Sequence, residues 1–199
     1  MSGGGDPRGP IEGGAFVAVV GPSGAGKDSV MAYARQRLVA EPRVHFVRRV
    51  ITRPSDPSLE DHDTMSASAF PQAEAAGAFA LSWSSHGLSY GIPAAVDELV
   101  RGGGVAVANL SRAALPALRR RYARVVVAEI TAAPAVLARR LAQRGRETAD
   151  EIAARLARSV AADAAAGDRH LIDNSGALAV AGDRFVALLR AAIAPPAGG

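Results

Sequence analysis

The clearest chemical feature of the sequence is a phosphate-binding loop. It joins an apolar segment, AFVAVV, to a segment with helical periodicity. Glycines at this spacing let backbone N–H groups turn toward an anion, the helix N-terminus adds its dipole, and a lysine carries a point charge to the β- and γ-phosphates. The alternative is a glycine-rich turn that only caps a helix. We predict that nucleotide phosphates are bound by Gly21, Pro22, Ser23, Gly24, Ala25, Gly26, Lys27, Asp28 and Ser29.

Lys27 and Asp28 are the unusual residues of this loop. Lys27 is the only lysine in the chain, so the other basic residues are arginines, as in proteins from GC-rich genomes. A lysine kept against that background indicates a need for a compact charge. Asp28 stands where such loops have a Ser or Thr that binds Mg²⁺. Its carboxylate can hold the ion directly or through water, or it can simply stabilise the first turn of the helix.

Arginines recur on single helical faces later in the chain. Arg140 and Arg144 are four residues apart, and a glycine follows them. Arg155 and Arg158 are three residues apart in the next predicted helix. Guanidinium forks bind phosphate oxygens and stabilise the charge that moves in phosphoryl transfer. We therefore predict an arginine-rich lid; the alternative is a solvated helix pair in which Glu151 and Arg155 form an ordinary surface ion pair.

The elements that must position these residues alternate between strands and helices. Short apolar runs predict strands at 15–20, 44–51, 79–84, 88–90, 105–110, 125–130 and 170–173. Amphipathic segments with capping residues predict helices at 27–39, 67–76, 93–100, 112–121, 134–144, 148–159 and 178–193. This alternation predicts an α/β P-loop NTPase fold of three layers, with about five mainly parallel strands and helices on both faces.

Composition and charge exclude several other classes of protein. The chain has no cysteine, which excludes a disulfide framework, a zinc ribbon and a thiol nucleophile. No apolar run reaches the roughly 18 residues of a membrane span, and the first residues do not resemble a signal peptide, so we expect a cytoplasmic protein without membrane contacts. The net charge of +4 is spread along the chain with only 5% aromatic residues, which argues against nucleic acid as a partner.

Several sequence runs together resemble the guanylate kinase superfamily and, within it, the ribose 1,5-bisphosphate phosphokinases. The runs are GPSGAGKDS, ITRP, WSSHGLSYGIP, RRLAQRGRE and EIAARLARS, and the resemblance covers roughly residues 15–190. It implies transfer of a phosphoryl group from ATP, with Mg²⁺, to the 1-phosphate of ribose 1,5-bisphosphate. The products would be 5-phosphoribosyl 1-diphosphate (PRPP) and ADP, in phosphonate catabolism. A monomer or a homodimer is expected.

The same resemblance implies a domain plan and the roles of particular residues. One kinase domain would span 15–193, with an acceptor-binding insert at about 52–95 and a lid at about 140–158; residues 1–14 and 194–199 are expected to be disordered. Catalytic roles fall to Lys27, Arg140, Arg144 and Arg155, and Asn174 would lie beside the adenine. The acceptor would be bound by Thr52, Arg53, His62, Ser82, Tyr90, Gly91, Asn109 and Arg112.

The predicted acceptor residues favour a sugar phosphate over a nucleotide as the acceptor. Guanylate kinases read guanine with a glutamate where Ser82 precedes Trp83, and without a carboxylate the guanine N–H groups lack an acceptor. Arg112 adds a cation, which suits a sugar that carries two phosphates and no base. The alternatives are a guanylate kinase and a non-catalytic guanylate-kinase-like binding module, although such modules typically lose the residue that Lys27 represents.

Overall fold

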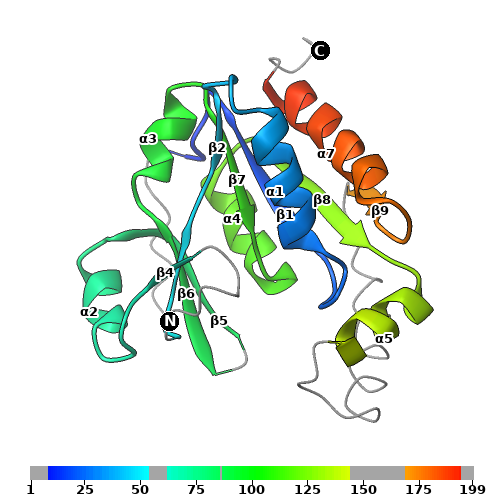
Figure 1. Ribbon diagram of the computed structural model, residues 1–199. Helices are drawn as coiled ribbons and strands as arrows, with labels where there is room; N and C mark the ends of the chain where they lie inside the picture. Colours follow the sequence, from blue (N-terminus) through cyan, green and yellow to red (C-terminus); the bar gives the residue numbers. More distant parts are fainter. Residues whose placement is uncertain (1–8, 54–61, 86, 144–168, 194–199) are drawn as a thin grey trace.

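The main sheet places the phosphate-binding loop at the carboxyl end of its central strand. A computed structural model describes residues 9–53, 62–85, 87–143 and 169–193 (Figure 1). All neighbouring strands of the five-stranded main sheet are parallel, which confirms the predicted sheet. In spatial order the strands are β2 (Val44–Phe46), β7 (Val105–Asn109), β1 (Ala15–Val20), β8 (Val125–Thr131) and β9 (His170–Asp173).

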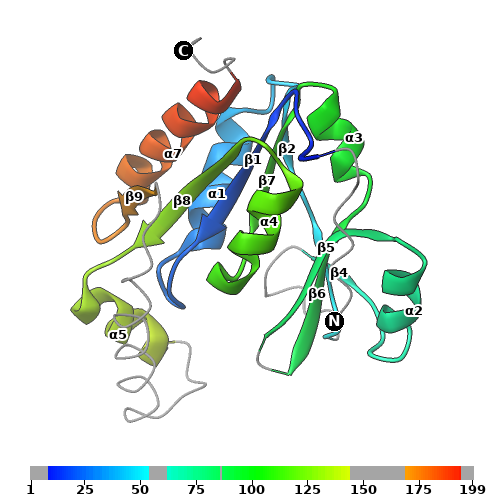
Figure 2. The ribbon, with the colours of Figure 1, turned by 180° about the vertical axis from the view of Figure 1, so that it is seen from behind.

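Helices cover both faces of this sheet, so every residue of β1 is buried. Val17 and Val19 pack on one side with helices α1 (Lys27–Arg37), α5 (Pro134–Gln143) and α7 (Leu178–Ile193). Phe16 and Ala18, which point the other way, pack with α3 (Val96–Arg101) and with the 3-10 turn η1 (Arg112–Ala114) and α4 (Leu115–Arg121). Figure 2 shows α4 on the face opposite α1 and α7. Within the described ranges, no helix combines the length and apolar character needed to cross a membrane.

Residues 9–14 are ordered, in contrast to the predicted disordered leader. Ile11 is buried, and its N–H donates to the carbonyl of Arg121 at 2.7 Å. The N–H of Ala123 donates in turn to the Ile11 carbonyl at 2.9 Å. One buried apolar side chain and paired backbone groups are enough to hold this segment against α4. The remaining predicted termini, 1–8 and 194–199, lie outside the described residues.

The segment 44–51, expected to be one strand, is divided between two sheets. β2 ends at Phe46, and β3 (Arg49–Ile51) joins a second, four-stranded sheet. The spatial order of that sheet is β4 (His62–Thr64), β3, β6 (Leu88–Pro93) and β5 (Phe79–Ser85). Helix α2 (Phe70–Ala75) packs on one face, where Phe70 stacks on Phe79 at 4.7 Å. Apolar alternation continues through both strands, so it does not reveal the change of sheet.

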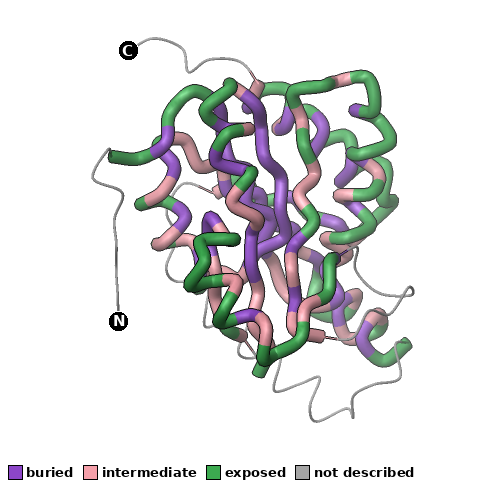
Figure 3. Tube along the Cα trace, turned by 90° about the vertical axis from the view of Figure 1, so that its left-hand side faces the viewer, coloured by how far each residue is buried: buried purple, intermediate pink, exposed green. Residues whose placement is uncertain are grey.

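Burial follows this arrangement of two sheets. In Figure 3 the buried trace runs through the main sheet, and exposed residues lie on its outer helices and turns. On the second sheet, Leu81 and Ile92 are buried in the same apolar cluster as Val96 and Val100 of α3. This face of the second sheet therefore packs against the α3 and α4 side of the main sheet.

A partly buried ionic cluster joins α3 to α4, with the side chain of Asp97 10% exposed and that of Arg121 34% exposed. Asp97 accepts hydrogen bonds from Arg121 Nε at 3.0 Å and from the Tyr122 hydroxyl at 2.8 Å. Burial, and then the hydrogen bond to Asp97, raise the pKa of the Tyr122 hydroxyl, which therefore remains a donor at neutral pH. We expect Asp97→Ala to lower the free energy of unfolding by about 2 kcal/mol, because it removes the carboxylate that accepts from both Arg121 and the Tyr122 hydroxyl.

Urea denaturation of both Asp97→Ala and Tyr122→Phe would test this expectation. Tyr122→Phe keeps the ring against Phe16, at 5.2 Å between centroids, and removes a single hydrogen bond. Its expected cost is about 1 kcal/mol. If both variants lost the same free energy of unfolding, the ion pair between Asp97 and Arg121 would contribute nothing beyond the hydrogen bond to Tyr122.

Candidate active site

The phosphate-binding loop forms a closed turn between β1 and α1. Gly21 has a φ of 141°, and a Cβ on it would lie 2.1 Å from the carbonyl oxygen of Ile130. Lys27 is the first residue of α1, and its Nζ donates to the carbonyls of Gly21 at 3.0 Å and Pro22 at 3.1 Å. The amine therefore folds back over the loop, where it would meet bound phosphate.

Asp28 and Asn109 meet beside this loop although they are far apart in sequence. Asn109 is the last residue of β7, next to β1, and its Nδ2 donates to Asp28 Oδ1 at 3.3 Å. Mg²⁺ in kinases is held by one or two carboxylates together with substrate phosphates. Asp28 supplies one such carboxylate beside the phosphate loop, and among the described residues no group of three or more His, Asp or Glu side chains could hold an ion. Nucleotide phosphates would have to complete the shell.

Arg140 and Asn174 support the outer side of the loop. Arg140 Nη2 donates to the Asn174 carbonyl at 2.9 Å, and its Nη1 lies 3.4 Å from the carbonyl oxygen of Gly24. Asn174 is buried, and its Nδ2 donates to the Ala25 carbonyl at 2.8 Å. Arg140 thus contacts loop backbone in this structure. Arg144 and Arg155, the other predicted lid arginines, lie outside the described residues.

A cavity of about 350 Å³ opens beside these two residues. It adjoins the phosphate loop on one side and the turn after β9 on the other, so it is placed to take the base and sugar of a nucleotide. Its lining residues are Gly24, Gly26, Ser29, Arg140, Gln143, Asn174, Gly176 and Leu178.

Ser82 and Tyr90, two of the predicted acceptor residues, lie on opposite faces of the second sheet. Trp83 and Tyr90 are directly opposed on β5 and β6 and therefore share a face, with ring centroids 5.3 Å apart. Ser82, one residue earlier, points to the other face, where its hydroxyl donates to Glu74 of α2. The predicted contrast with guanylate kinases rested on the missing carboxylate at Ser82. Glu74, which the sequence reasoning missed, brings a carboxylate to that hydroxyl.

Arg49 is a further residue that the sequence reasoning missed. Its guanidinium carbon lies 5.7 Å from the centroid of the Tyr90 ring, and only 7% of the residue is exposed. Because β6 lies between β3 and β5, Tyr90 has Arg49 on one side and Trp83 on the other. The repeated arginines at 48 and 49 were the available signal, but only the strand register tells which of them is buried.

Three further predicted acceptor residues lie beside strands of the second sheet, where Thr52 and Arg53 follow β3 and His62 begins β4. Thr52 uses its hydroxyl to accept the N–H of Ser89 at 2.9 Å, which ties it beside Tyr90. Arg53 follows, and its Nε and Nη2 are buried without a hydrogen-bond partner in the part of the chain that the structure describes. His62 is buried on β4. An anion beside Arg53 would satisfy these donors.

Arg112 belongs to a cluster that the sequence did not reveal. It is the first residue of η1, and its Nη2 donates to Glu129 of β8, a residue that is 1% exposed. Arg169 donates to the same carboxylate from just before β9. Neither Glu129 nor Arg169 belongs to a recognisable motif, so contact in space is the only signal.

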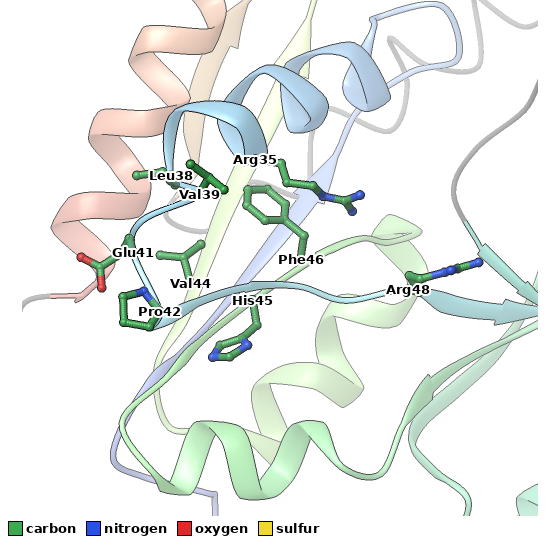
Figure 4. A pocket seen from close by; sticks show the side chains of 9 residues that line it. All are labelled: Arg35, Leu38, Val39, Glu41, Pro42, Val44, His45, Phe46 and Arg48. Atoms are coloured by element: carbon green, nitrogen blue, oxygen red, sulfur yellow. The ribbon is translucent and has the colours of Figure 1, made fainter.

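A second cavity, of about 450 Å³, lies away from these residues. Figure 4 shows it between the last turn of α1 and β2, at the other end of α1 from Lys27. Arg35 lies over the ring of Phe46 there, with the guanidinium carbon 5.4 Å from the ring centroid. This second cavity is larger than the cavity beside the phosphate loop, but the phosphate loop contributes none of the residues that line it.

Solved structures show the same fold. A guanylate kinase from Anaplasma phagocytophilum aligns with a TM-score of 0.68 and 16% identity, covering 94% of this chain and 90% of that chain. An unliganded sugar kinase from Janibacter sp. HTCC2649 aligns with a TM-score of 0.51 and 16% identity, covering 92% of this chain and 99% of that chain. At such low identity these matches establish the fold and nothing finer.

Curated relatives are much more similar in sequence. The chain is 56% identical over 186 residues to ribose 1,5-bisphosphate phosphokinase PhnN of Chelativorans sp., covering 93% of this chain and 89% of the relative. It is 51% identical to the protein of the same name from Brucella melitensis, covering 87% and 90%, and 51% identical to that from Agrobacterium fabrum, covering 88% and 96%. No protein-family model matches the chain.

Proposed function

The chain belongs to the ribose 1,5-bisphosphate phosphokinase family, and from this membership we propose that it transfers the γ-phosphoryl group of ATP to the 1-phosphate of ribose 1,5-bisphosphate. One P–O bond of ATP breaks and one forms at the 1-phosphate, so the products are ADP and 5-phosphoribosyl 1-diphosphate. The accepting oxygen is already anionic at neutral pH. The protein therefore needs to supply alignment and positive charge rather than a general base.

The chain's own residues divide these tasks between two sides. On the donor side, Lys27 neutralises charge on the transferring phosphoryl group, while Arg140 and Asn174 hold the loop backbone in place. Bound Mg²⁺ would add further charge neutralisation, held by Asp28 and the phosphates. On the acceptor side, Arg53 and Arg112 bind the phosphates of the sugar.

The position of Arg49 is the main structural support for a sugar phosphate as the acceptor. A purine acceptor binds best against a free aromatic face, and Tyr90 is the aromatic residue that the family resemblance assigns to this site. Trp83 and Arg49 already flank its ring. Arg49 also brings a cation, and guanidinium groups bind phosphate oxygens, of which a sugar bisphosphate carries two sets. These features favour a sugar phosphate over a nucleotide.

ADP release coupled to a spectrophotometric assay would test the proposed function. ATP and Mg²⁺ are supplied with ribose 1,5-bisphosphate or GMP as separate acceptors. We expect turnover with the sugar bisphosphate and none above background with GMP. Turnover with GMP alone would instead identify a guanylate kinase, and silence with both acceptors would favour a non-catalytic binding module.

Replacing Arg49 tests whether this residue contributes to binding of the sugar bisphosphate. We expect Arg49→Met to lower kcat/KM for ribose 1,5-bisphosphate by about 10- to 100-fold, mainly through KM, because it removes one charged contact with a phosphate. Steady-state kinetics would measure this change. Arg35→Met is the matched control, since Arg35 also lies over an aromatic ring but at the other cavity. Equal effects of the two variants would remove Arg49 from the site.

A further inference from the structure

A buried carboxylate holds two arginines at the carboxyl end of the main sheet. The side chain of Glu129 is 2% exposed, and its Oε1 accepts from Arg112 while its Oε2 accepts from Arg169. The arginines come from segments 57 residues apart in the chain (169 minus 112). Their side chains are 25% and 15% exposed, so each arginine side chain keeps some surface open to solvent.

This cluster lies next to the phosphate loop. Glu129 is the register partner of Val20, the residue directly before Gly21. Arg112 follows Asn109 by three residues, and Asn109 contacts Asp28 of the loop. The backbones of β8 and the loop are also in close contact, as shown by the 2.1 Å between a Cβ on Gly21 and the Ile130 carbonyl oxygen. The cluster therefore borders the loop at which the donor phosphates would bind.

Glu129 also points toward the side on which the acceptor residues lie. Residues 128 and 130 of β8 pack with α1 and α7, whereas Val127 packs with the cluster that contains Trp83 of the second sheet. Because side chains alternate along a strand, Glu129 shares the face of Val127. The two guanidiniums are thus held on the face that packs against the second sheet.

From this arrangement we propose that Glu129 is a positioning residue and that Arg169, with Arg112, is a further binding residue for a phosphate of the acceptor. A guanidinium has five N–H donors in one plane, so a bond to one carboxylate oxygen orients the others. One carboxylate that bonds two guanidiniums orients both at once. This proposal rests on the proposed function, since it assumes a sugar bisphosphate as the acceptor.

Kinetic constants of Glu129→Gln and Arg169→Met would test the proposal. We expect each variant to raise KM for ribose 1,5-bisphosphate about tenfold or more, the effect of losing one charge-assisted contact, and to change KM for ATP less than about threefold. Arg169→Met leaves the pair of Arg112 and Glu129 in place, so it remains informative if Glu129→Gln folds poorly. The double variant should be less impaired than the product of the single effects, because Glu129 acts through Arg169.

Glu98→Gln is the matched control. Glu98 pairs with Arg101 on the surface of α3 and has 79% of its side chain exposed, so its kinetics should equal those of the wild type. Normal kinetic constants in Glu129→Gln, with only a lower melting temperature, would show that the cluster is structural and overturn the proposal. A raised KM for ATP alone would overturn it as well, because the arginines would then serve the donor.

Calorimetric titration of ribose 1,5-bisphosphate without ATP distinguishes this proposal from the proposed function. Tight binding to the wild type, weakened about tenfold in both variants, supports the proposal even if turnover fails. Equal binding by wild type and variants overturns the proposal and leaves the proposed function intact. Wild-type protein that neither binds nor phosphorylates the sugar overturns both.

Discussion

Replacing Lys27 with alanine is expected to lower kcat by about 1,000-fold or more, because it removes a cation from the transferring phosphoryl group. The Nζ of Lys27 bonds the Gly21 and Pro22 carbonyls at the mouth of the loop. Losing such partly exposed bonds should change the free energy of unfolding by only about 1 kcal/mol. The coupled ADP assay measures kcat, and thermal melting shows whether the variant is folded.

Arg37→Ala is a suitable control for the loss of Lys27. Arg37 ends the same helix, where it lies over the Tyr33 ring, so the variant removes a positive charge from α1 without touching the loop. We expect it to keep the wild-type rate. If Lys27→Ala kept more than about a hundredth of that rate, charge neutralisation by this lysine would not be central to the transfer.

Gly26→Ala should abolish most nucleotide binding, with ATP affinity falling about 100-fold or more. Gly26 has a φ of 83°, and a Cβ on it would lie 2.5 Å from Asn174 Nδ2. That nitrogen donates to the Ala25 carbonyl at 2.8 Å, so it cannot move without giving up its support of the loop. Two costs therefore combine, the left-handed backbone and the displacement of Asn174.

Gly103→Ala separates these two costs. Gly103 also has a φ of 83°, but a Cβ on it would meet no atom within 4 Å, and the residue is remote from the loop. It should show the backbone cost alone, about 1 kcal/mol of stability, with normal ATP affinity. Titration calorimetry with ATP compares the variants. Equal ATP affinities in Gly26→Ala and Gly103→Ala would mean that Asn174 does not constrain the loop.

Local features of the fold were predictable from the sequence. The closing helix at 178–193 and the strand at 170–173 have the predicted bounds, because each is a continuous run with its own hydrophobic period. Ser111 caps η1, where its hydroxyl accepts the N–H of Ala113 at 3.3 Å. Such interactions join residues a few positions apart, so sequence order alone places the partners together.

The class of acceptor could also be predicted, but for a reason that the structure changes. The predicted family is confirmed by relatives that are 51–56% identical to this chain over the aligned residues. Ser82 could distinguish the acceptors only if its side chain faced the acceptor together with Tyr90. The strand register instead turns Ser82 toward Glu74 and leaves Arg49 beside Tyr90. A shift of one residue along a strand changes the face, and that register depends on pairing with other strands.

The phosphate loop, its cation and the alternation of strands and helices follow from local sequence, because backbone conformation and helix capping depend on neighbouring residues. Which distant polar groups meet depends on the tertiary fold, which brings Asn109 to Asp28, and Glu129 to Arg112 and Arg169. Parallel strands bring such residues to one edge of the sheet from positions far apart in the chain. Burial then strengthens their pairing, and neither effect leaves a periodic signal in the sequence.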